Sequence, residues 1–329
     1  MVRGMVRRVL QFSQPHLGIV DLSKKFYSLP MGSASNILQI PQRLDLKGIS
    51  SLLGQWDLSK KTTLVLDPYQ WVDPVGLVGI SCLMDLAEKE YGHHTSIDYS
   101  NCNNASYWER MEFFKCMGLV GPSPNGERHQ ADGRFCELKK IEDDNNTDSI
   151  TKALVDTLCL EKYSSSWLAV HHIISEAINN VCHHSDSFGY AHAQYLPNSD
   201  RVNISIGDSG IGLQSALSRV YPEIQTDKQA VIKALQPCVT SNPPHNRQTE
   251  RRNRGVGLTT IHRLVEACEG DLHLWSGDTL WHNGTSTHHY GRWSGALVAV
   301  SIKRDKITPQ FHELMEGIHE EIAAIEKQR

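Results

Sequence analysis

The period of apolar and polar positions changes several times along the chain. In its first third, short apolar runs at 37–40, 63–67 and 96–99 predict buried strands. Residues 75–89 carry apolar side chains at helical spacing, and residues 105–117 do the same with Trp, Met and Phe. Strands that alternate with helices in this way predict a small α/β domain.

A different arrangement follows in the second half. Residues 121–149 are rich in Pro, Gly and polar side chains, as linkers are, and one strand is predicted inside them at 134–141. Thr308 is a good N-cap, and Pro309 suits the first position of a final amphipathic helix. The elements predicted after the linker are helices at 150–160, 166–184, 259–268 and 309–327 and strands at 202–206, 272–275 and 296–302.

These patterns predict an α/β (α+β) protein, and a length of 329 residues agrees with about two domains. The expected parts are an N-terminal arm at 1–30, a small α/β domain at 31–122, a linker with a possible strand at 123–149, a second domain at 150–307 and a C-terminal amphipathic helix at 308–329.

Composition and charge narrow the function classes. Hydrophobic residues make up 40% of the chain and charged residues 21%, which is typical of globular proteins and not of disordered ones. The formal net charge is −4, so nucleic acid is not an expected partner of the molecule as a whole. No apolar run reaches the ~18 residues that a membrane span needs. We therefore expect a cytoplasmic protein that does not enter the membrane.

Cysteine and histidine give little sign of a metal site. The eight cysteines lack the two-residue spacing of zinc and redox motifs, which favours reduced, packed thiols. His282, His288 and His289 belong to a Gly/Ser/Thr-rich stretch. For this stretch a surface loop is the preferred interpretation over a metal site.

The predicted helix at 166–184 carries a polar row beside its apolar face. His172, Glu176, Asn180 and His184 follow one another at four-residue intervals. An amide oxygen such as that of Asn180 can coordinate Mg²⁺, and a carboxylate such as that of Glu176 can deprotonate a water or hydroxyl that attacks a phosphoryl group. A solvated helix face is the alternative explanation of this row.

Two glycine-rich turns follow. The first, Asp208-Ser-Gly-Ile-Gly212, comes where a strand ends, so its glycines allow close approach of a flat ligand while Asp208 can accept a hydrogen bond from an exocyclic amine. The second, Arg254-Gly-Val-Gly-Leu258, opens a helix whose free N–H groups can hold phosphate. The segment between them ends in the basic residues Arg247, Arg251, Arg252 and Arg254, which indicates a mobile lid; a solvated disordered loop is the alternative.

In their order and spacing, these elements resemble the GHKL ATPases, the family of gyrase, heat-shock chaperones, histidine kinases and mismatch-repair ATPases. Glu176-Ala-Ile-Asn-Asn180 is similar to the N box, and the two turns are similar to the glycine boxes. Glu176 and His184 together are most similar to the anti-sigma-factor Ser/Thr kinase branch. The chain departs from the family in its long lid and in Ser294-Gly295, where a Gly-Thr pair is expected.

This resemblance implies a Bergerat fold at 150–307, a two-layer α/β sandwich that binds ATP and Mg²⁺. It implies that Asn180 binds the metal, that Asp208 binds the adenine amine, and that Glu176 is the catalytic base. Gly210 and Gly212 would permit the approach of the nucleotide. The second glycine box would face the phosphates with Arg254, Gly255, Val256, Gly257 and Leu258.

The first domain is similar to STAS-like modules of the anti-sigma-factor-antagonist type. The similarity rests on Leu64-Val-Leu-Asp67 and Trp71-Val-Asp-Pro-Val-Gly-Leu77. Phosphoregulated members have Ser or Thr after the second Asp, whereas Pro74 and Val75 follow Asp73 here. Asp73 and Pro74 are expected to serve as helix cap and first-turn proline.

Three functions remain open at this point. The first is an ATP- and Mg²⁺-binding regulatory protein whose lid orders with nucleotide and which hydrolyses ATP slowly. The second is a Ser/Thr protein kinase of the anti-sigma-factor type, and the third is a nucleotide-free adaptor that uses the fold for protein binding. Expected partners are proteins that contact the STAS-like domain or the lid, and a homodimer through the C-terminal helix is a further hypothesis.

Overall fold

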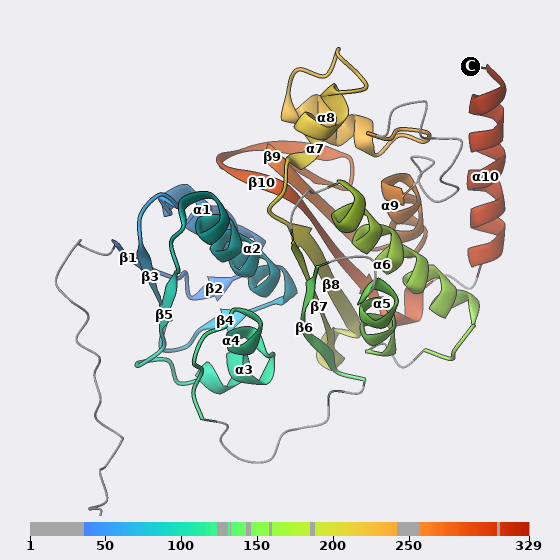
Figure 1. Cartoon of the computed structure of the whole chain (residues 1–329). Helices are drawn as coiled ribbons and strands as arrows, with labels where there is room; N and C mark the ends of the chain where they lie inside the picture. The colour runs from blue at the N-terminus through green and yellow to red at the C-terminus, as the bar shows by residue number, and fades with distance from the viewer. Residues whose placement is uncertain are drawn as a thin grey trace, which may run out of the picture. The chain divides into compact units, whose positions relative to one another are not determined.

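The computed structural model describes residues 36–123, 131, 133–142, 146–157, 160–184, 188–241, 257–307 and 310–328. Residues Ser35–Arg329 form one compact unit. Within it, helices lie on both faces of a five-stranded sheet, and a smaller three-stranded sheet lies beyond one of these helix layers (Figure 1).

The three-stranded sheet is parallel and has the order β1-β3-β5. Its strands are β1 (Asn36–Gln39), β3 (Thr62–Val65) and β5 (Ser96–Asp98), close to the three predicted strands. A two-residue pair, β2 (Arg43–Leu44) and β4 (Trp71–Val72), leads into the helices of the same region. These helices are α1 (Leu46–Gln55), α2 (Pro74–Tyr91), α3 (Ala105–Arg110) and α4 (Phe113–Cys116).

Helix α2 begins and ends as its sequence predicts. The Asp73 carboxylate accepts a hydrogen bond from the Gly76 N–H at 2.9 Å, and Pro74 occupies the first turn. Gly92 ends the helix in the left-handed conformation, with φ 69°. Buried residues surround most of the helix circumference, as expected of a helix that lies between two sheets.

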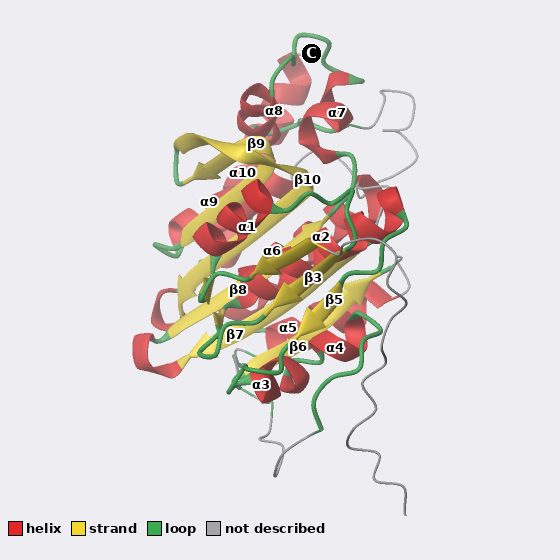
Figure 2. Ribbon diagram, turned by 90° about the vertical axis from the view of Figure 1, so that its left-hand side faces the viewer, coloured by secondary structure: helices red, strands yellow, loops and turns green. Residues whose placement is uncertain are grey.

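The five-stranded sheet is antiparallel and has the order β6-β7-β8-β10-β9 (Figure 2). One face is covered by helices α5 (Thr147–Asp156), α6 (Ser165–His184) and α9 (Gly257–Ala267). Its strands are β6 (Phe135–Ile141), β7 (Gly189–Leu196), β8 (Arg201–Asp208), β9 (Asp271–His282) and β10 (Thr285–Lys303). Strand β6 confirms the strand predicted inside the linker, and it pairs with β7.

The opposite face of this sheet shares a core with the N-terminal helices. Trp275, Trp293 and Leu297 of the sheet pack in one cluster with apolar residues of α1 and α2. Side chains alternate along β8, so Ile206 faces α6 and α9 while Gly207 lies against Val78 of α2.

Polar contacts reinforce the same junction. Tyr190 on β7 donates a hydrogen bond to Asp85 on α2 at 2.7 Å. Arg110 on α3 pairs with Glu137 on β6 at 2.6 Å, and each side chain is 19% exposed. The N-terminal region and the five-stranded sheet are therefore held together by apolar packing and by half-buried polar pairs.

Two predictions about local structure are wrong. The helix expected at 105–117 is broken into α3 and α4, because Glu112 adopts a left-handed φ of 58°. The loop expected around His282, His288 and His289 consists of strand residues of β9 and β10, joined by a turn at Asn283 and Gly284. This segment is a pair of strands and not a loop because β9 and β10 pair with each other as an antiparallel hairpin.

The segment predicted to be a mobile lid is described only in part. Its first part folds into α7 (Gly212–Ser218) and α8 (Asp227–Ala234), which enclose a small apolar cluster. Thr226 and Gln229 form a capping box that starts α8. Residues 242–256, which hold the basic part of the segment, lie outside the described residues.

The C-terminal helix α10 (Phe311–Gln328) packs on its own chain. Ile318 and Ile322 bury their side chains against Cys238, and Arg263 of α9 forms a two-contact ion pair with Glu321. Thr308 and Pro309 lie outside the described residues. Among the helices described, none combines the length and apolarity that a bilayer crossing needs.

The shared core leads to a stability prediction. Leu297→Ala should lower the free energy of unfolding by about 2–5 kcal/mol, because it leaves a cavity where the sheet meets α1 and α2. Chemical denaturation should show one transition for both regions, since one core serves both. Ile232→Ala, on an exposed side chain of α8, is the control and should change stability by less than about 0.5 kcal/mol. Two well-separated transitions would contradict the shared core.

Candidate functional site

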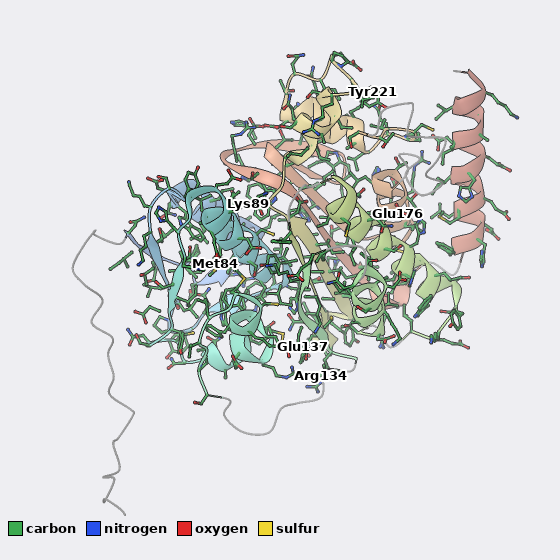
Figure 3. All side chains as sticks on the ribbon, viewed as in Figure 1. Met84, Lys89, Arg134, Glu137, Glu176 and Tyr221 are labelled. Carbon is green, nitrogen blue, oxygen red and sulfur yellow. The ribbon has the colours of Figure 1, made fainter. Side chains whose placement is uncertain are left out.

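Helix α6 positions the first pair of candidate side chains. Its apolar residues enter the core, so Glu176 and Asn180, one turn apart, lie half-buried at the border of that core. Figure 3 labels Glu176 on this helix. Burial raises the pKa of the Glu176 carboxyl above its usual value, which brings it nearer to the range of a general base at neutral pH.

The rest of the polar row on α6 is not brought to the same place. His172 lies against Phe311 of α10, with ring centroids 6.1 Å apart. Burial lowers the pKa of His172 to about 4, so its ring is neutral at physiological pH. The side chain of His184 is outside the described residues. Of this row, His172 therefore contacts α10, whereas Glu176 and Asn180 line the cavity described below.

Asp208 ends strand β8 and is only 4% exposed. Its Oδ1 accepts the Gly210 N–H at 2.7 Å, and its Oδ2 accepts the Ala296 N–H at 3.3 Å. Burial raises the pKa of Asp208 to about 7, although these two N–H groups favour the charged form. The carboxyl is therefore held in one orientation and changes its charge near neutral pH.

Two of the predicted glycines allow close approaches that a side chain would prevent. Gly212 has φ 75°, and a Cβ there would lie 2.8 Å from the Ser294 carbonyl oxygen. A Cβ on Gly257, the first residue of α9, would lie 2.7 Å from Oε2 of Glu176. The glycine at 257 therefore lets the start of α9 approach the carboxylate on α6.

A cavity brings these segments together. It contains about 920 Å³ of empty space, which includes open solvent. Its polar side chains come from α6, from the end of β8 and from Thr240 and Ser241. The start of α9 contributes Gly257 and Leu258, and much of the remainder is aliphatic. The predicted site residues in its lining are Glu176, Asn180, Asp208, Gly212, Gly257 and Leu258.

The other predicted site residues have different positions. Gly210 is buried beside the cavity, where its N–H bonds to Asp208 and its carbonyl oxygen accepts the Ser294 hydroxyl at 3.2 Å. Arg254, Gly255 and Val256 lie outside the described residues.

Sequence reasoning missed the residues that hold the first glycine turn from outside. Ser276 of β9 accepts the Leu213 N–H at 2.9 Å and donates to the Gly295 carbonyl oxygen at 2.8 Å. The Trp293 indole N–H donates to the main-chain oxygen of Asp208 at 3.0 Å. One signal for these contacts is present in the sequence, where Ser294-Gly295 replaces the expected Gly-Thr pair. Residue 295 has to be a glycine here, because a Cβ would lie 2.2 Å from Oδ1 of Asp208.

The donor set of the cavity fits a magnesium nucleotide. Nδ2 of Asn180 is buried without a hydrogen-bond partner among the described residues, so the carboxamide is free to orient toward a ligand. In the part of the chain that the structure describes, no group of three or more His, Cys, Asp or Glu side chains could hold a metal ion by itself. Asn180 would therefore share a cation with oxygens of the ligand.

Comparison with known families agrees with this geometry. Residues 166–301 match the family of histidine kinase-, DNA gyrase B- and HSP90-like ATPases. This stretch forms a GHKL ATPase domain. It extends from the start of α6 into β10, and its family binds ATP, typically with Mg²⁺. A comparison of the chain with curated proteins finds no match.

The GHKL domain gives the pKa of Asp208 a measurable consequence. If Asp208 accepts the adenine amine, only its carboxylate form binds ATP, so affinity should fall by up to about tenfold for each pH unit below 7. Asp208→Asn should weaken ATP binding by about tenfold or more at pH 8 and remove this pH dependence. Isothermal titration calorimetry between pH 5.5 and 8.5 measures both effects.

Asp73→Asn is the matched control, because burial also raises the pKa of Asp73 to about 7, and Asp73 caps α2 away from the cavity. This variant should keep the parent's pH profile of ATP binding. For each of these carboxyls, burial raises the folded pKa above the ordinary value of an aspartate side chain. The free energy of unfolding should therefore fall as pH rises from about 4 to about 7. An unchanged pH profile in Asp208→Asn would remove Asp208 from adenine binding.

Proposed function

We propose that this chain is a regulatory protein that binds ATP and Mg²⁺, hydrolyses ATP slowly and signals through a protein partner. The observation that carries the proposal is the cavity, where polar side chains from α6 and from the end of β8 share one space with the glycine that starts α9. A GHKL domain that had lost nucleotide binding would not need to keep a buried carboxyl and a partnerless amide in that space.

Each residue has a proposed role that follows from its position. Asp208 accepts the adenine amine, because its carboxylate is fixed at the deep end of the glycine turn. Gly210 and Gly212 let the turn approach the base, and the N–H groups around Gly257 at the start of α9 face the phosphates. Mg²⁺ held by Asn180 would neutralise phosphate charge.

Glu176 is the proposed general base. Its carboxylate takes a proton from the attacking water as the water oxygen bonds to the terminal phosphorus and the bridging P–O bond of ATP breaks, which releases phosphate and ADP. The position beside Gly257 supports this role, because the start of α9 is where the phosphates would lie.

A regulatory output is supported by the arrangement around the sheet. The domain that carries the cavity shares a core with the N-terminal α/β region, so a change in one can alter the packing of the other. We propose that this region is STAS-like and contacts the partner, with Leu64-Val-Leu-Asp67 on β3 and the loop after it, and with Trp71-Val-Asp-Pro-Val-Gly-Leu77 at the start of α2. The ordering of a lid stays a prediction from the sequence.

A protein kinase of the anti-sigma-factor type is the second candidate, because Glu176 could equally activate a hydroxyl of another protein. The structure disfavours transfer to the start of α2 within the same chain. That helix covers the face of the sheet opposite α6, and Pro74 and Val75 provide no hydroxyl. A kinase reaction would therefore act on a separate molecule.

The role of Glu176 leads to a kinetic prediction. Glu176→Gln should bind ATP with nearly the affinity of the parent and release phosphate at least about 100-fold more slowly, because the base acts in the transition state and not in binding. Calorimetry and a phosphate-release assay measure the two quantities. Glu266→Gln, on the exposed side of α9, is the control and should change neither. Phosphate release at the parent rate in Glu176→Gln would place the base elsewhere.

One labelling experiment separates the three functions. The full chain is incubated with Mg²⁺ and ATP labelled at the terminal phosphate, with and without cell extract. Free labelled phosphate without extract is the expected result and supports slow hydrolysis. Label on a protein of the extract, lost with Glu176→Gln, would support the kinase instead. If neither product forms and calorimetry detects no ATP binding, the nucleotide-free adaptor is the function that remains.

A further inference from the structure

Trp293 connects the adenine end of the cavity with the N-terminal region. It is 1% exposed, and its ring belongs to the core that the sheet shares with α1 and α2. Its indole N–H donates to the main-chain oxygen of Asp208 at 3.0 Å. Asp208 lies one residue beyond Gly207, whose partner Leu297 ends the pairing of β8 with β10. The indole therefore supplies a donor where the β8–β10 ladder has stopped.

The residues around Trp293 form a strap, defined here as residues 291–296. Its last residues hold the glycine turn, because Ser294 donates to the Gly210 carbonyl oxygen and the Ala296 N–H donates to Asp208. Its first residue, Gly291, lies against α1, where an added Cβ would be 2.9 Å from Cγ of Leu53 and 3.2 Å from the Gly54 nitrogen. The strap thus contacts the N-terminal region at one end and the adenine site at the other.

Further contacts fix the strap from the side of α1. Ser50 on α1 and His289, just before the strap, share a hydrogen bond of 2.7 Å between Oγ and Nδ1. A displacement of α1 would therefore be passed to the strap, since the packed core has little room for independent movement.

We propose that Trp293 is a positioning residue for adenine recognition, and that α1 acts through the strap to set the orientation of Asp208. This inference rests on the proposed binding of ATP in the cavity. The N-terminal region would then influence nucleotide binding from outside the cavity. Among the described residues, none from that region lines the cavity. By linkage, nucleotide binding and the packing of α1 must then influence each other equally.

The indole N–H and the ring have separable roles. Trp293→Phe keeps an aromatic ring in the core but removes the donor to Asp208 together with one ring of the indole, so its control must lose the same volume. Trp275→Phe is the matched control, because Trp275 is 0% exposed, lies in the same core and donates its indole N–H to the Gly277 carbonyl oxygen at 3.2 Å instead. The two variants remove the same chemical group with different partners.

The test measures base discrimination in the full chain with Mg²⁺ present. Calorimetry gives the Kd for ATP and for purine riboside triphosphate, which lacks the 6-amino group. We expect the parent to favour ATP by about tenfold, the scale of one charge-assisted hydrogen bond. Trp293→Phe should reduce this ratio to about threefold or less, whereas Trp275→Phe should keep it. General destabilisation would weaken both nucleotides together and leave the ratio unchanged.

A second pair of variants tests whether α1 acts on Asp208 through the strap. This test does not depend on the folding of Trp293→Phe. Gly291→Ala should lower the ATP preference, because the methyl group pushes the strap away from Leu53. Adding Leu53→Ala removes the contacted side chain and should restore at least part of the preference. A normal ratio in Gly291→Ala, or no recovery in the double variant, would overturn the action of α1.

The remaining outcomes separate this inference from the proposed function. If the parent favours ATP and Trp293→Phe keeps the parent's ratio, Trp293 has no positioning role, while ATP binding stands. Equal loss of the ratio in Trp293→Phe and Trp275→Phe would also overturn the assignment to the Trp293 N–H. A parent that binds neither nucleotide would overturn both the inference and the proposed function.

Discussion

The five-stranded sheet is apolar on both faces, and the rest of the structure depends on covering them. An apolar sheet face left in water would be a large exposed patch of the kind that soluble chains avoid. On one face, α5, α6 and α9 provide the cover and bring Glu176 and Asn180 to the border of the core. On the other face, the cover is α1 and α2 of the N-terminal region. The GHKL domain at 166–301 therefore does not stand alone in this chain.

The same constraint explains the environment of Asp208. Strand β8 passes between two helix layers, so its last residue ends in a dry part of the molecule. A buried carboxyl is costly unless hydrogen bonds satisfy it, and the N–H groups of Gly210 and Ala296 provide them. Burial still dominates and raises its pKa to about 7. Asp208 thus holds its carboxyl in a fixed direction, which suits the proposed recognition of an exocyclic amine.

The proposed catalytic groups lie in a different environment. Glu176 and Asn180 are half-buried beside Gly257, whereas Asp208 is almost fully buried. A base and a metal ligand need access to water and phosphate, whereas the adenine contact gains from its exclusion of water. The cavity therefore changes from buried and rigid at Asp208 to more accessible at α9. In the proposed arrangement, the packing of α1 and α2 affects the Asp208 end of the cavity directly. It affects the α9 end only through the sheet.

Much of the site was readable from the chain alone because its signals are local. The four-residue spacing of Glu176 and Asn180 places them on one helix face wherever that helix lies. Glycines that follow Asp208 at a strand end predict a tight turn, because glycine adopts backbone conformations that other residues avoid. The capping of α2 by Asp73 and Pro74 was predicted for the same reason, and the structure confirms it. Alternation along residues 202–206 likewise predicted a strand, and β8 confirms it.

Only the tertiary structure decided the contacts between distant segments. Nothing near Trp293 in the chain indicates that its N–H reaches Asp208, 85 positions away, or that Ser276 would hold Leu213. Pairing of β9 with β10 converted an expected loop into strands, and the small core of α7 and α8 folded part of an expected lid. Such outcomes depend on which surfaces become partners, and short-range periodicity does not encode that choice. The sequence determined the candidate groups for the chemistry, and packing on the second face of the sheet decided what holds Asp208 in place.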